Sequence, residues 1–258
     1  MPHPRLRLAA ACCCALAALL AGGAVIAGAG GATVEYENLV LRADGGFAPR
    51  ALPRHRFAPI EFKGHVEIAA RDGGQPLALE QAVIRFDRDG RLAVAGLPTC
   101  PAERVATLDS AAARRVCRGA IVGTGRLGAL VQLGSTLVPA SAALTVFNAP
   151  RVDGHPAVVI HARTTTPNVQ TYAIVAPIER LRGEYGYRVT IDVPPIAGGL
   201  GAITHISAAI GRRYRAGGKN RSYVAARCSD NVLRTRGSFR FAGGLLVEGS
   251  VEKFCRQQ

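Results

Sequence analysis

Five basic side chains close to residue 217 form the clearest candidate binding site in the sequence. Three of them precede the pair Gly217-Gly218 and two follow it, and a glycine pair between short flanks is typical of a hairpin turn. A hairpin would gather the five cations at one tip, where they would attract polyanions or anionic surfaces in a salt-sensitive way. The candidate anion-binding residues are Arg212, Arg213, Arg215, Lys219 and Arg221.

The chain as a whole is strongly basic. It has 32 Lys and Arg residues against 18 Asp and Glu, a net charge of +14, which falls to +12 if a leader containing Arg5 and Arg7 is removed. This excess favours an anionic polymer or a membrane surface as the partner; the alternative is that arginine only keeps the surface solvated. Sequence-specific nucleic-acid binding is not indicated, because the basic residues are scattered, no reading helix appears and tryptophan is absent.

A literal G-x-G-x-x-G motif spans Gly123–Gly128. Dinucleotide binding through this motif needs a helix after the glycines and an acidic residue about 20 positions later. The residues that follow are typical of a strand, and no acidic residue occurs before Asp153. The segment therefore predicts a bulged, glycine-rich strand and no bound cofactor.

Asp87, Asp89 and Gly90 match the beginning of a calcium-binding loop. The later ligand positions of such a loop fall on Ala95 and Pro98, which carry no side-chain oxygen. We predict instead that the Asp-Gly turn joins two strands as a β-hairpin.

The histidines predict no enzyme of a recognised type. No H-E-x-x-H or G-x-S-x-G motif accompanies them, and a metal site is not indicated because C-x-x-C and closely spaced histidine pairs are also absent. We expect a non-enzymatic protein; the alternative is a secreted hydrolase of unrecognised type. A concave cleft that gathers His161, an acidic residue and a Ser or Thr would favour the hydrolase. The histidines beyond the leader are His55, His65, His155, His161 and His205.

The first 32 residues have the three parts of a secretory signal peptide. Two arginines supply a positive start, residues 8–26 are apolar, and the small residues that follow suit cleavage after Ala29 or Ala32. The alternative is an uncleaved anchor, since these 19 apolar residues just suffice to cross a bilayer. We expect a secreted or extracytoplasmic protein in which residues 33–258 form a single all-β domain.

Four cysteines lie beyond the leader, and an even number in a secreted chain indicates disulfides with three possible connectivities. Spacing favours the local solution, Cys100–Cys117 and Cys228–Cys255, and each bridge would contribute about 3 kcal/mol in the chain-entropy model. The alternating apolar residues before Cys228 and before Cys255 place both on the interior side of their strands, which supports the second pair.

Period-two alternation of apolar and polar residues dominates the rest of the chain, most clearly over residues 185–193. About twelve short strands separated by Gly, Pro or Asp predict an all-β sandwich or a barrel-like antiparallel fold. The other expected strands lie near residues 34–41, 62–70, 82–86, 92–94, 119–133, 141–148, 157–162, 171–176, 203–210, 221–228, 236–242 and 245–254.

One helix is expected over residues 108–116, inside the Cys100–Cys117 loop, where Asp109 or Ser110 precedes three alanines as a cap. Residues 45–58, which combine proline with basic residues, are expected to form a loop.

Four segments carry a resemblance to other sequences: Leu97–Cys100, Cys117–Ala120, Gly211–Tyr214 and the final strand that ends in Cys255. Together they resemble uncharacterised secreted proteins of high-GC actinobacteria, over most of the mature chain. That resemblance implies export and the cysteine framework, and it supplies no activity and no catalytic residue. We therefore expect a secreted or envelope-associated β protein that is structural or binds an anionic envelope component.

Overall fold

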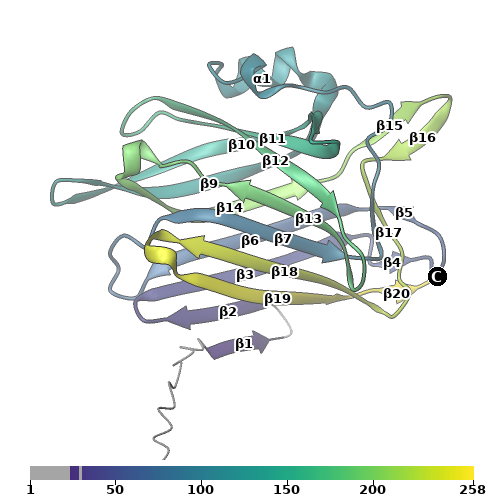
Figure 1. Cartoon of the computed structure of the whole chain (residues 1–258), viewed down its shortest axis with the longest axis horizontal. Helices are drawn as coiled ribbons and strands as arrows, with labels where there is room; N and C mark the ends of the chain where they lie inside the picture. Colours follow the sequence, from purple (N-terminus) through teal and green to yellow (C-terminus); the bar gives the residue numbers. More distant parts are fainter. Residues whose placement is uncertain (1–23, 29–30) are drawn as a thin grey trace, which may run out of the picture.

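The computed structural model describes residues 24–28 and 31–258 and consists mainly of strands (Figure 1). Thirteen strands form one sheet in the spatial order β1-β2-β3-β6-β14-β9-β10-β11-β12-β13-β7-β18-β19. In chain order they are β1 (Ala24–Gly28), β2 (Gly31–Tyr36), β3 (Leu39–Ala48), β6 (Glu61–Ala70), β7 (Leu79–Asp87), β9 (Ile121–Leu133), β10 (Thr136–Val152), β11 (His155–Thr164), β12 (Gln170–Arg180), β13 (Tyr185–Asp192), β14 (Gly201–Ile210), β18 (Val232–Phe241) and β19 (Leu246–Phe254).

The sheet curls until its ends approach each other. β19 packs against β2 and β3, so the antiparallel sheet is nearly closed into a barrel (Figure 1). Side chains at alternate strand positions fill the interior, and the most deeply buried of them include Leu41, Ile68, Phe239 and Phe241. The predicted all-β, barrel-like fold is confirmed, because period-two alternation places one apolar face of each strand toward a common core.

Three small sheets hold the remaining strands, most of which lie at one end of the barrel, at the right of Figure 1. One is the hairpin of β15 (Arg213–Ala216) and β16 (Lys219–Ser222). The second contains β5 (Ala58–Pro59), β17 (Val224–Ala226) and β8 (Gly90–Leu92). In the third, β20 (Arg256–Gln257) pairs in parallel with β4 (Ala51–Leu52), which ties the C-terminal residues to the segment that follows β3.

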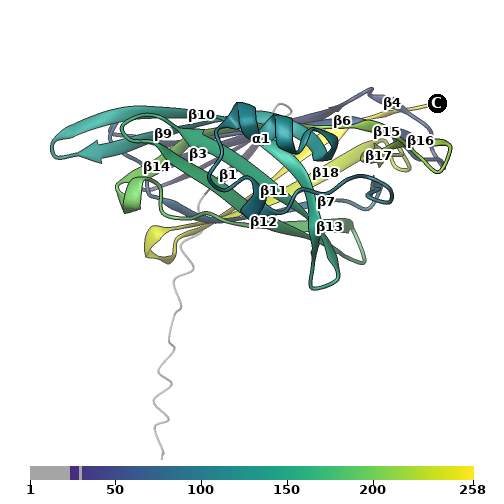
Figure 2. The ribbon, with the colours of Figure 1, turned by 90° about the horizontal axis from the view of Figure 1, so that it is seen from above.

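The segment between Cys100 and Ala120 covers the outer face of β10 and β11 (Figure 2). It contains the 3-10 turns η1 (Ala102–Arg104) and η2 (Arg118–Ala120) around the helix α1 (Ser110–Val116). Beneath it Phe147 and Val159 are fully buried, although they project away from the barrel interior. A second, smaller core therefore lies outside the barrel. Two further 3-10 turns are η3 (Ala197–Gly199) and η4 (Ala242–Gly244).

The helix expected over residues 108–116 is confirmed and begins two residues later. Its N-cap is Asp109, whose carboxylate accepts hydrogen bonds from Ala111 N and Ala112 N at 2.9 and 2.8 Å. The cap satisfies two backbone donors that a helix otherwise leaves open at its first turn.

The loop expected over residues 45–58 is confirmed only in part: residues 49–50 and 53–57 are irregular, and the others belong to strands. β3 continues to Ala48, where Phe47 is buried and lies opposite Phe62 of β6, and β4 and β5 occupy further positions of the segment. The apolar side chain of Phe47 holds this part of the chain on the barrel despite the neighbouring proline. The strand expected over 221–228 is divided at the buried Tyr223, which lies between β16 and β17.

The β-hairpin expected at Asp87–Gly90 is wrong. The chain turns there, but β7 pairs with β13 and β18, whereas β8 leaves the barrel sheet and pairs with β17. The reason is that both aspartates are anchored to residues 227–234, as described below.

The glycine motif at 123–128 lies within β9, as predicted, and a register shift between β9 and β10 occurs next to Gly123. A Cβ atom on Gly125 would stand 1.9 Å from Ser207 O of β14. The glycines therefore permit close approach of two backbones, and no helix follows them to bind a phosphate.

Most of the expected signal peptide, residues 1–23 and 29–30, lies outside the described residues. Residues 24–28 form β1, which pairs antiparallel with β2. Within the described ranges the structure contains no helix of the length and apolarity needed to cross a membrane.

Candidate anion-binding site

The basic residues near 217 lie on a two-stranded hairpin that projects from the end of the barrel (Figure 1). β15 and β16 pair with Ala216 opposite Lys219 and Tyr214 opposite Arg221. Gly217 and Gly218 both have positive φ angles, of 57° and 73°, as the two central residues of a type I′ hairpin turn require. The hairpin that the glycine pair predicted is therefore present.

Arg212 differs from the other four cations. Its Nη1 donates hydrogen bonds to Ile121 O at 2.7 Å and to Arg118 O at 3.1 Å, so its half-buried guanidinium joins the hairpin to the start of β9. Arg212 therefore has a structural role. The exposed candidates that remain are Arg213, Arg215, Lys219 and Arg221, which we call the hairpin cations.

The hairpin cations occupy both faces of the ribbon. Residues directly opposite each other share a face, so Lys219 and Arg221 project with Tyr214, and Arg213 and Arg215 project from the other face. Within each pair the backbone positions are about 6.6 Å apart, which is less than the screening length of about 8 Å at physiological ionic strength. The charges of each pair therefore act together on a partner.

The four side chains form no ion pair with an acidic residue in the described part of the chain. Other arginines do: Arg71 pairs with Glu35, Arg188 with Glu179, and Arg236 with Glu248. The positive potential of the hairpin is thus not neutralised locally, which suits this surface to an anionic partner.

Tyr214 holds the hairpin on the body of the protein. Its hydroxyl hydrogen is shared between Ala93 O and Ala95 O, at 3.1 and 3.2 Å, and burial raises the pKa of the phenol. Gly96 packs closely against the same ribbon, since a Cβ there would stand 2.5 Å from Ala216 Cβ. The hairpin is therefore a fixed platform for its cations.

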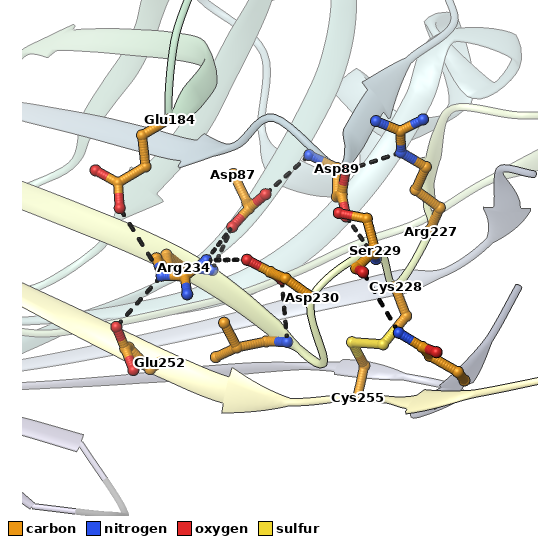
Figure 3. A network of polar contacts seen from close by, with 12 residues as sticks. Asp87, Asp89, Glu184, Arg227, Cys228, Ser229, Asp230, Arg234, Glu252 and Cys255 are labelled. Atoms are coloured by element: carbon orange, nitrogen blue, oxygen red, sulfur yellow. Dashed lines mark hydrogen bonds and ion pairs between the residues drawn. A yellow bond between two sulfur atoms is a disulfide. The ribbon is translucent and has the colours of Figure 1, made fainter. Parts of the chain in front are cut away.

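Both predicted disulfides are present. Cys100–Cys117 spans 17 residues and closes the segment that covers β10 and β11. Cys228–Cys255 spans 27 residues and joins the chain after β17 to the end of β19, so it clamps the last strand of the barrel (Figure 3).

Two buried aspartates anchor the region beside the second disulfide (Figure 3). Asp89, 1% exposed, accepts hydrogen bonds from Arg227 Nε and Ser229 N, both at 2.8 Å. Asp87 accepts hydrogen bonds from Asp89 N and Arg234 N at 2.8 and 2.9 Å. These donors are N–H groups, which repel a cation, so the arrangement does not suit calcium.

The two aspartates differ in pKa. Burial raises the pKa of Asp87, and the backbone hydrogen bonds from Asp89 and Arg234 oppose it only in part. Burial also acts to raise the pKa of Asp89, but the hydrogen bonds from Ser229 and Arg227 outweigh it and leave that pKa lowered. Asp89 is therefore the more acidic of the two carboxyl groups.

His161 does not lie in a cleft. It is fully buried beneath the Cys100–Cys117 segment, where Nε2 donates to Leu108 O at 3.0 Å and Nδ1 has no hydrogen-bond partner in the described structure. Thr145 lies directly opposite on β10, and its hydroxyl also has no partner there. A hydrolase would be favoured by a cleft that joins His161 with an acid and a hydroxyl. His161 is instead buried, with no access from a cleft.

Three residues that sequence reasoning did not group come together elsewhere. His65 and Glu67 of β6 lie beside His205 of β14 on the outer face of the sheet. All three occupy the polar positions of strands that the sequence predicted. What the sequence did not predict is that strands 140 residues apart are neighbours.

Comparison with known proteins adds no functional assignment, since no family model, curated protein or solved structure matches this chain.

Proposed function

We propose that the protein is a secreted or envelope-associated, non-enzymatic β protein that binds an anionic polymer of the cell envelope through the hairpin cations. The observation that carries the proposal is the exposed, unneutralised set Arg213, Arg215, Lys219 and Arg221 on a rigid hairpin. Polyanions with regularly spaced phosphate or sulfate groups suit such a site, because each contact releases condensed counterions.

Export is the second part of the proposal. Disulfides persist in oxidising compartments, and this chain has two that stabilise separate parts of the fold. The basic, apolar and small-residue sections of the N-terminus agree with a signal peptide. The protein recovered outside the cytoplasm should begin at Gly30 or Thr33, as measured by N-terminal sequencing. Recovery of the intact chain in membranes would support the uncleaved anchor instead.

The binding test replaces the four hairpin cations with Gln and leaves Arg212 in place, because Arg212 holds the hairpin to β9. Affinity for heparin and for a poly(glycerol phosphate) teichoic acid is measured between low and physiological salt. The slope of log affinity against log salt should become shallower by up to about one per charge removed. Folding should be retained, since exposed substitutions usually cost less than about 0.5 kcal/mol each.

A matched control removes the same charge from dispersed positions. Arg42, Arg104 and Arg115 are exposed on β3, η1 and α1, and Arg182 is exposed in the loop between β12 and β13. Their replacement by Gln lowers the net charge by the same amount. If the hairpin forms the site, the control variant keeps most of the wild-type slope. Equal slopes for the two variants would mean that only overall charge matters, and the hairpin would lose its assigned role.

A further inference from the structure

Two histidines and a glutamate meet on the outer face of the barrel. The ligand atoms of His65, Glu67 and His205 all lie within 4.8 Å of one another. His65 Nε2 is 3.2 Å from Glu67 Oε1, and the rings of His65 and His205 have their centroids 4.7 Å apart at 61°. This is a compact group of three metal-binding side chains.

The register of the sheet fixes this geometry. His205 lies directly opposite Glu67, and His65 precedes Glu67 by two residues on β6, so all three side chains project from the same face. The intervening residues Val66 and Ile206 face the core. β6 lies between β3 and β14, and β14 lies between β6 and β9, so the ligands stand on internal strands whose backbones are paired on both sides.

The neighbouring charges leave the group accessible. Arg42 of β3 lies opposite Glu67 but forms no ion pair with it among the described residues. Asp44, opposite His65, is paired with Lys253 at 2.7 Å. The His65 and Glu67 side chains are 40% and 49% exposed, so water can complete a coordination shell.

The donor set selects a class of metal. Two imidazole nitrogens and one carboxylate suit zinc and its neighbours cobalt, nickel and copper, whereas calcium and magnesium require mainly oxygen ligands. With bonds of about 2.1 Å and tetrahedral angles, the donor atoms would stand about 3.4 Å apart. The His65 Nε2–Glu67 Oε1 separation of 3.2 Å is close to this value. The donor atom of His205 lies within 4.8 Å of the other two, so side-chain rotation has to bring it to bonding distance of a shared ion.

We propose that His65, Glu67 and His205 form an open site for a divalent transition-metal ion. The protein supplies three ligands, and the remaining positions belong to water or to a donor group from outside the chain. The site stands on an exposed sheet face and not in a pocket, so its role is metal capture or metal-bridged attachment. The metal site and the hairpin cations share no residue, so an experiment can disprove one proposal and leave the other standing.

The test is a Zn²⁺ titration of the full chain by calorimetry, with any thiols of Cys12, Cys13 and Cys14 alkylated first because free thiolates also bind zinc. One saturable equivalent is expected. His65→Gln/His205→Gln should weaken its binding at least tenfold, and Glu67→Gln should weaken it without changing the fold. Co²⁺ bound to the same position should give visible absorption typical of nitrogen and oxygen ligands.

The matched control is His55→Gln/His155→Gln, which removes two exposed histidines from other parts of the surface. It should retain the wild-type affinity. Zn²⁺ should also raise the melting temperature of the wild type and of the control, but not that of His65→Gln/His205→Gln. Equal affinities for the two double variants, or the absence of a saturable equivalent in the wild type, would overturn the proposal.

Discussion

Asp89 and Arg227 form an ion pair at 2.8 Å in which the carboxylate is buried and the guanidinium is one-third exposed. Arg227 immediately precedes Cys228, so the pair fixes the chain at the point where the second disulfide begins. The other carboxylate oxygen of Asp89 binds Ser229 N, on the far side of the same cysteine. The side chain of Asp89 thus holds both residues that flank Cys228. Asp89 is 140 residues away from one of them, Ser229, in the sequence.

Asp89→Ala should therefore destabilise the protein by about 2–4 kcal/mol, because it leaves a buried N–H and a partly buried guanidinium without their acceptor. Urea unfolding measures the change. Glu103→Ala, which removes an exposed carboxylate from η1, is the control and should cost less than about 0.5 kcal/mol. Similar losses for the two variants would contradict the structural role of Asp89.

His161 makes stability depend on pH. Burial lowers the pKa of His161 below its usual 6.5, against the opposing effect of the Leu108 and Val105 carbonyls. The unfolded chain consequently binds a proton more readily, and stability that is complete above pH 6.5 is lost as the pH falls toward the lower pKa of the folded state. The difference in urea midpoint between pH 7 and pH 5 should shrink in His161→Gln and persist in His155→Gln. An unchanged difference in His161→Gln would exclude His161 as the cause.

Each disulfide should contribute about 3 kcal/mol in the chain-entropy model. Cys100→Ser/Cys117→Ser and Cys228→Ser/Cys255→Ser should each lower the melting temperature by roughly 6–12 °C for a chain of this size. Calorimetry measures the shift, and reduction of the wild type with dithiothreitol should reproduce the sum of the two. Non-reducing peptide mapping that linked Cys117 to Cys228 would contradict the pairing.

Gly125 allows β9 and β14 to pair, since a Cβ at that position would overlap Ser207 O. Gly125→Ala should cost about 2–3 kcal/mol or more, because the two strands must separate to admit the methyl group. Gly46→Ala is the matched control: it also lies in a strand, with nothing within 4 Å of the added Cβ. Circular dichroism melting curves distinguish the two, and equal melting temperatures would show that the strands adapt without loss.

Local signals in the sequence predicted much of this fold. Alternation identified strands such as β13, and short loops favoured the two disulfides. The pair Asp109 and Ser110 indicated where α1 begins, and the structure assigns the cap to Asp109. These features depend on neighbouring residues, whose spacing the sequence displays directly.

The sequence predictions that were wrong or missing concern contacts between distant parts of the chain. Asp87 and Asp89 have the local pattern of a hairpin turn, but their hydrogen bonds run to residues 227–234. The grouping of His65 with His205 likewise depends on which strands become neighbours. Strand order is set by packing of the whole barrel and by register. Neither a turn motif nor the alternation of inward and outward side chains along a strand specifies it.

The position of β7 in the sheet has a kinetic consequence. β7 ends at residue 87, yet its two partners, β13 and β18, begin at residues 185 and 232. As the chain emerges N-terminus first, β7 has both edges open until about a hundred further residues have followed, and closing such long loops makes folding slow. Until those partners are made, β7 is a strand with two open edges, and open strand edges can pair with other chains.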